Sequence, residues 1–108
     1  MESWDVASLD VQPHHPQVLH SDKNTRAIAI NLPAGELMQE HETHERAYLV
    51  VAAGRLEVDQ GGEVADAGPG FLAHFEASER REIRATEDAL VIIILAPWPG
   101  EGHPGARS

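Results

Sequence analysis

Histidines are the side chains best suited to chemistry in this sequence of 108 residues. The chain has seven histidines and no cysteine, so any metal must be held by His, Asp or Glu, and no thiolate or disulfide chemistry is expected. The densest group runs from Glu40 to Arg46, where His41 and His44 stand among carboxylates. Because imidazole is both the usual metal ligand and the usual general base near neutral pH, a site is expected here first.

This histidine segment begins at the end of one apolar run and finishes at the start of another, so we expect it to connect two strands at one rim of a barrel, where barrels place ligand sites. His41 and His44 are three residues apart and converge only if the residues between them turn. Together with His74 or Glu45 they could form an octahedral or tetrahedral site. One hypothesis is therefore a divalent metal, Zn, Ni, Mn or Fe, held by His41, His44 and His74.

A second hypothesis needs no metal and depends on Arg81. Side chains two apart on a strand share a face, so Arg81 should point inward with the apolar Ile83. A buried guanidinium needs a carboxylate partner, which could be Glu45, Glu79 or a bound ligand. In this alternative, Arg81 and His41 grip the carboxylate of a small molecule.

The elements that must position these groups are short strands. No segment carries apolar residues at helical spacing over three turns, whereas runs rich in Val, Ile and Leu recur between glycine and proline turns. The pattern predicts an all-β barrel or sandwich. The predicted strands are 26–32, 36–41, 47–53, 55–60, 63–65, 70–75, 81–85 and 90–96.

The length favours a single domain, because two independent cores would each be too small. We expect an N-terminal arm over residues 1–25, a barrel over residues 26–96 and a C-terminal tail over residues 97–108. The first segment contains Pro13-His14-His15-Pro16, which should be extended, and the tail has three prolines and three glycines. Both are predicted to be irregular arms laid on the barrel or on a partner subunit.

Two strands are apolar on both faces. In the strand from Ala47, Leu49 and Val51 share one face, and the other face is also apolar; the run 90–95 has the same character. A strand buried on both sides in so small a protein must be covered from outside, and a homodimer formed by packing barrel faces is the expected partner. The ligand site itself would be lined by Leu49, Val51 and Phe71.

One part of the chain resembles the cupin family. Gly35 is followed after five residues by His41, and then by Gly54, in the stretch LPAGELMQEHETHERAYLVVAAG; a second half opens at Gly68. In cupins the first motif supplies a His-x-His pair and a glutamate, and the second motif supplies another histidine, which together hold a metal. The resemblance spans roughly residues 27–95 and implies a single-domain cupin, a double-stranded β-helix or jelly-roll barrel with irregular arms.

The ligand positions of the cupin motifs are mostly changed. Only His41 carries over, because Thr43 stands where the second histidine would be and Ala47 stands at the glutamate position. In the second motif the histidine position falls on Glu79 by strict spacing, or on Arg81 if the loop is two residues longer. The chain is similar to small single-domain cupins with one motif histidine, which have no assigned reaction.

Charge and hydropathy narrow the class of protein. Eighteen acidic and eight basic side chains give a formal charge of −10, which repels nucleic acid. The longest apolar run, 89–96, is too short to span a membrane, so a soluble cytoplasmic protein is expected. The sequence does not decide whether the chain is an enzyme. The function expected is small-molecule binding at the mouth around His41, and the alternative is a non-catalytic sensing or structural dimer without metal.

Overall fold

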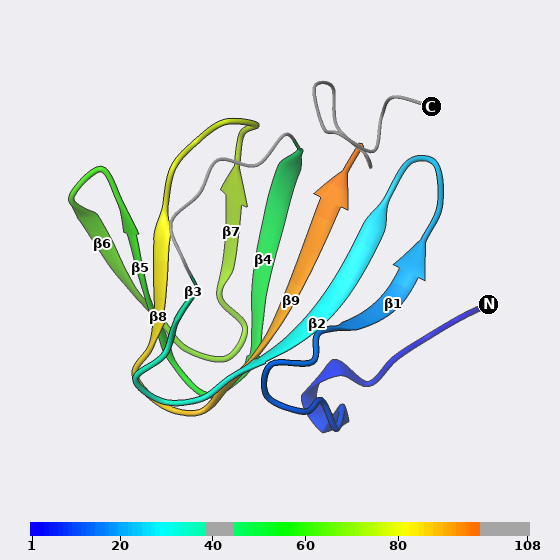
Figure 1. Ribbon diagram of the computed structural model, residues 1–108, viewed down its shortest axis with the longest axis horizontal. Helices are drawn as coiled ribbons and strands as arrows, with labels where there is room; N and C mark the ends of the chain where they lie inside the picture. The colour runs from blue at the N-terminus through cyan, green and yellow to red at the C-terminus, as the bar shows by residue number, and fades with distance from the viewer. Residues whose placement is uncertain (39–44, 98–108) are drawn as a thin grey trace.

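The computed structural model of the chain describes residues 1–38 and 45–97, and within them the fold is almost entirely β (Figure 1). A single turn of 3-10 helix, η1, spans Val6–Ser8. The strands are β1 (Gln17–Ser21), β2 (Arg26–Leu32), β3 (Leu37–Met38), β4 (Arg46–Ala53), β5 (Leu56–Gln60), β6 (Glu63–Ala67), β7 (Leu72–Phe75), β8 (Glu82–Ala85) and β9 (Ala89–Ala96). In this described part, no helix has the length and apolar character needed to cross a membrane.

The strands form two sheets, in which every pairing is antiparallel. The larger sheet has the order β1-β2-β9-β4-β7, and the smaller has the order β3-β8-β5-β6. Figure 1 shows the two sheets facing each other and diverging toward one rim, at the top of that view. The predicted all-β class is thus confirmed, with the two-sheet arrangement of a jelly roll.

Most predicted strands are found within a residue or two of their expected bounds. One strand that was not predicted, β1, lies in the segment expected to be an irregular arm. This strand pairs with β2, and its register shifts between Val18 and His20. Because a bulge breaks the period-two alternation of side chains, the sequence pattern does not reveal the strand. The prediction of a strand over 36–41 is met only at β3, since residues 39–41 lie outside the described part.

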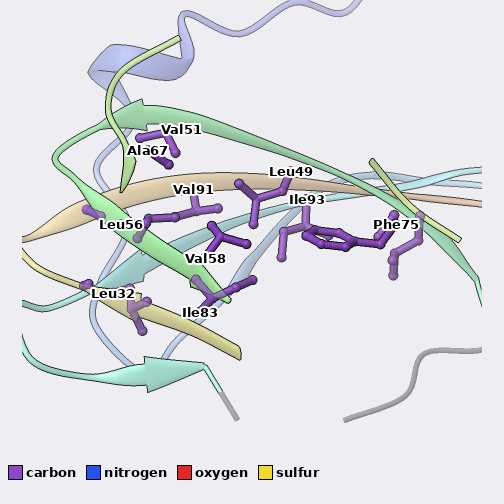
Figure 2. Close-up of a cluster of buried hydrophobic side chains, with 14 residues drawn as sticks. Leu32, Leu49, Val51, Leu56, Val58, Ala67, Phe75, Ile83, Val91 and Ile93 are labelled. Carbon is purple, nitrogen blue, oxygen red and sulfur yellow. The ribbon is translucent and has the colours of Figure 1, made fainter. Parts of the chain in front are cut away.

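The core lies between the two sheets and is built by alternation. On β4, Leu49 and Val51 face inward, while on the opposite sheet Leu56 and Ile83 meet them; all four are almost fully buried. Figure 2 shows these side chains pointing toward one another with Val91 of β9. The inner faces of both sheets are therefore closed by side-chain packing.

The outer face of the larger sheet is covered in part by the chain's own N-terminal segment. Ala29, Leu90 and Ile92 are buried on that face and pack with Val11, and Val6, Leu9 and Leu19 pack against this cluster. The Asn31 amide donates to the backbone oxygen of Val11 over 2.7 Å. This cover accounts for much of the two-sided apolar character of β9. The homodimer stays a prediction, and Tyr48 and Leu72 remain exposed on the uncovered part of this sheet.

His20 joins the N-terminus to the hairpin between β1 and β2. Its Nδ1 lies 3.1 Å from Glu2 Oε1, and its Nε2 lies 2.8 Å from Asp22 Oδ2. The hydrogen bond to Asp22, followed by that to Glu2, raises the pKa of His20 above 6.5. Asp22 also accepts from the backbone N–H groups of Asn24 and Thr25. The hydrogen bond with His20, followed by these two, lowers the pKa of Asp22 to about 2.

We expect the His20 imidazole to titrate above 6.5 in an NMR pH series, and Asp22→Asn to bring its pKa back toward that value. Because the folded-state pKa is raised, the stabilisation from this contact is fully present below the unfolded pKa and is lost as the pH rises through the folded one. Asp66→Asn, on the opposite sheet, is the matched control and should leave the pKa of His20 unchanged. A wild-type pKa at or below 6.5 would contradict the contact.

Candidate functional site

The rim of the barrel gathers the ends of strands from both sheets. β4 begins there at Arg46, β7 ends there at Phe75, and β8 begins there at Glu82. The hairpin from Gln60 to Glu63 joins β5 to β6 at the same end (Figure 1). Antiparallel pairing of β4 with β7 and of β5 with β8 forces these ends together.

Arg81, directly before β8, lies inside this rim. Its side chain is 6% exposed, and it stands two residues before the buried Ile83, as alternation requires. The guanidinium carbon lies 4.9 Å from the centroid of the Phe75 ring, within the range of a cation–π contact. Arg81 Nη1 also donates to the backbone oxygen of Glu79 over 3.4 Å. The structure thus places a guanidinium from one sheet on an aromatic ring from the other.

The electrostatics of Arg81 follow from its burial. Loss of water lowers the pKa of the guanidinium, and the neighbouring Glu79 carboxylate opposes that change. An arginine nevertheless keeps its proton at any physiological pH. The rim therefore contains a permanent positive charge that is largely removed from solvent.

Glu79 fixes the loop that carries Arg81. Its Oε1 accepts the backbone N–H of Glu76 over 2.8 Å, and its Oε2 accepts the side-chain amide of Gln60. The same loop contains Ser78 at φ +68°, a left-handed conformation that a serine adopts only where its surroundings hold it. The loop between β7 and β8 is in this way tied to the end of β5.

Glu45 is the second buried charge. It is 3% exposed, and in the described residues Glu45 and Arg81 are the charged side chains that are buried. Glu45 stands two residues before the inward-facing Ala47 and so shares its face. A carboxylate at the start of β4 and a guanidinium before β8 are therefore contributed to one interior by opposite sheets.

A pocket of about 150 Å³ lies beside Phe75, between β7 and the pair β5 and β6. Phe71, predicted to line the ligand site, does line this pocket. Leu49 and Val51, predicted to line it as well, are each 1% exposed and belong to the packed core. The pocket is walled instead by Val58, Ala65, Phe71, Ala73 and Phe75, with Gln60, Glu63 and His74 at its border.

The predicted metal ligands are not brought together in the described part of the structure. His41 and His44 lie outside the described residues. His74 lies between Ala73 and Phe75, which pack on the core, so alternation turns its ring to the outer face, where its centroid is 4.8 Å from that of Tyr48. Across residues 1–38 and 45–97, no group of three or more His, Asp or Glu side chains is arranged to hold a metal ion.

Two residues of the site were not predicted from the sequence. The ring of Phe75 makes a cation–π contact with the Arg81 guanidinium, and the Gln60 side-chain amide donates a hydrogen bond to Glu79. The position of Phe75 could have been found from the sequence, because Phe71 and Phe75 are four residues apart in the strand predicted at 70–75 and so share a face. Nothing in the sequence around Gln60 indicates a contact with a loop nineteen residues away.

Solved structures with this architecture are numerous. An RmlC-like cupin from Desulfovibrio desulfuricans is 22% identical, with a TM-score of 0.78, over 90% of this chain and 97% of that one. A cupin superfamily protein from Desulfitobacterium hafniense is 13% identical, with a TM-score of 0.78, over 89% and 91%. KdgF from Halomonas sp. is 23% identical, with a TM-score of 0.72, over 82% and 85%. At these identities the likeness shows the fold alone.

A family model described as a cupin domain matches residues 28–96, a range that begins within β2 and runs through β9. No curated protein matches the chain. The matched range covers more than half of the chain. This chain therefore belongs to the cupin family.

Proposed function

We propose that this protein binds a small molecule bearing a carboxylate at the barrel mouth, and that Arg81 grips the carboxylate. The observation that carries the proposal is the buried guanidinium of Arg81 on the ring of Phe75, beside an apolar pocket. Guanidinium is planar and presents paired donors that match a carboxylate. The buried Glu45 and His41, which lies outside the described residues, are proposed to complete the site.

Burial makes this charge useful for recognition. An ion pair in a low-dielectric surrounding is stronger than one at the surface, although both partners must lose water to form it. Arg81 already loses most of its water when the protein folds, so on binding it is mainly the ligand carboxylate that must lose water. The bonds from Gln60 and Glu76 to Glu79 hold the Arg81 loop before a ligand arrives. Such preorganisation increases affinity by reducing the entropy lost on binding.

We expect acetate and benzoate to raise the melting temperature of the protein by mass action, and the neutral isostere benzamide to raise it much less. Arg81→Met should weaken benzoate binding by about tenfold to a hundredfold, because hydrogen bonds to charged groups contribute about 1.5–3 kcal/mol. Arg81→Lys should give an intermediate loss, since the charge stays and the paired geometry goes. Dissociation constants from calorimetry or NMR titration are the measurement.

Arg84→Met is the matched control for this test. Arg84 is three residues from Arg81, is exposed, and pairs with Glu82 over 3.9 Å. The control should keep wild-type affinity for benzoate. Each variant is compared with its own unliganded form, so a change in stability does not imitate a change in binding. Benzoate affinity that survives Arg81→Met would refute the proposal.

Metal analysis of protein purified without a histidine tag tests the metal-dependent hypothesis. Its predicted ligands are His41, His44 and His74, two of which lie outside the described residues, and the described donors do not form a metal cluster. If the protein contains stoichiometric metal, and the metal is lost on His41→Ala, the metal-dependent hypothesis is correct and the metal-free binding of a carboxylate by Arg81 is wrong. A protein that responds to neither metals nor carboxylates would favour the non-catalytic structural dimer.

A further inference from the structure

We infer that the site selects monocarboxylates with a compact apolar body and rejects dicarboxylates of similar size. The inference rests on the proposed function and adds to it the chemical class of the ligand. It is carried by the size and apolar walls of the pocket beside Phe75 and by the negative charge at its border, two properties that the carboxylate grip by Arg81 does not use.

The pocket and Arg81 belong to one site because two separate contacts join them. Phe75 lines the pocket, and its ring also carries the Arg81 guanidinium. Gln60 lines the pocket as well and binds Glu79, whose backbone oxygen accepts from Arg81. Arg81 itself does not line the pocket, so the inference is that a ligand held by its carboxylate at the guanidinium extends past Phe75 into this space.

The walls of the pocket favour an apolar group of limited size. Val58, Ala65, Phe71, Ala73 and Phe75 present aliphatic or aromatic surface to a volume of about 150 Å³. Two of the five are alanines, and a larger side chain at either position would occupy the space. Apolar ligand atoms gain free energy by leaving water for such a surface. A short alkyl chain or a single ring suits it.

The border of the pocket disfavours a second negative charge. Glu63 lines the pocket at the β5–β6 hairpin, directly opposite Gln60 in the strand register. The Glu79 carboxylate is also near this border, because it accepts the side-chain amide of Gln60. The distal carboxylate of a diacid would approach these groups in a protein of formal charge −10. Placing like charges together is a common means of rejecting a related ligand.

Three ligands test the inference: acetate, butyrate and succinate. We expect butyrate to bind about tenfold more tightly than acetate, because each buried methylene contributes about 0.8 kcal/mol. Succinate has the same number of carbons as butyrate with a second carboxylate, and it should bind at least about tenfold more weakly than butyrate. NMR titration of the full chain gives the dissociation constants and shows which residues respond.

Two variants with matched controls locate the effect. Ala73→Val fills the pocket and should weaken the binding of butyrate about tenfold, while the binding of acetate changes little. Its control is Ala27→Val, on β2 of the same sheet and three strands away, which should change the affinity for neither ligand.

Glu63→Gln removes the charge at the border of the pocket and should improve succinate binding about threefold. Glu57→Gln, exposed on β5 and outside the pocket lining, should not improve it.

The outcomes separate this inference from the proposed function. If acetate, butyrate and succinate all bind through Arg81 with equal affinity, or if Ala73→Val leaves butyrate binding intact, the selectivity is wrong and the carboxylate grip stands. If none of the three binds, and benzoate does not bind either, the proposed function itself is overturned.

Discussion

Gly54→Ala should lower the free energy of unfolding by about 3 kcal/mol, the largest loss that we expect from adding a single carbon to this chain. Gly54 has φ +78°, a conformation that costs any residue with a side chain. A methyl group there would lie 2.0 Å from the backbone oxygen of Asp88 and 2.6 Å from the Cα of Ala89. Because backbone atoms are in the way, the turn after β4 must separate from the start of β9.

Denaturation by urea or heat measures this loss, and Gly70→Ala is its matched control. Gly70 has a similar φ of +89°, but nothing lies within 4 Å of the added carbon. Gly70→Ala should lower the free energy of unfolding by only about 1 kcal/mol, because it loses only the preference of glycine for a positive φ. Equal losses at Gly54 and Gly70 would mean that the close approach of Asp88 contributes nothing.

The second large effect is expected at Leu49. Leu49→Ala should lower the free energy of unfolding by about 2–5 kcal/mol, since it removes a side chain that is 1% exposed and leaves a cavity between the sheets. Figure 2 shows Leu49 among Val91, Ile93 and Phe75, side chains that cannot all move into the space. Urea denaturation at fixed pH is the measurement.

Leu72→Ala makes the same chemical change on a neighbouring strand, where the leucine is 62% exposed. We expect it to cost less than about 0.5 kcal/mol in the monomer, because few contacts are lost. The pair therefore separates burial from the intrinsic preference of leucine for a strand. A loss at Leu72 as large as that at Leu49 would contradict the arrangement, unless it depended on protein concentration, as the loss of a dimer contact does.

The strands could be predicted from the sequence because most of them obey a simple period. β2 was expected at residues 26–32 and is found there, since turns bound it on both sides. β1 was not expected, because its bulge at Leu19 hides the alternation. An N-terminal arm laid on the barrel was one of two expectations, but the contact of Val11 with β9 was not predicted, since it joins residues far apart in the chain.

The site could be predicted from the sequence where the alternation of side chains along a strand alone decides which way a side chain points. Ile83 identifies the inward face of its strand, and Arg81 follows it. The same rule applied to Ala73 and Phe75 turns the ring of His74 outward, which the expectation of a His74 metal ligand did not take into account. Leu49 and Val51 do face inward, but alternation alone does not tell whether an inward side chain packs in the core or lines a pocket.

By itself, the amino-acid sequence determined the all-β class, most strand bounds and the cupin resemblance, because these depend on local alternation, turn residues and the spacing of glycines. Only the tertiary structure decided that Arg81 lies on Phe75, that Gln60 holds Glu79, and that the pocket lies beside Phe75 rather than over Leu49. Those contacts join strands of different sheets, and their geometry depends on how the two sheets pack, which no local pattern specifies.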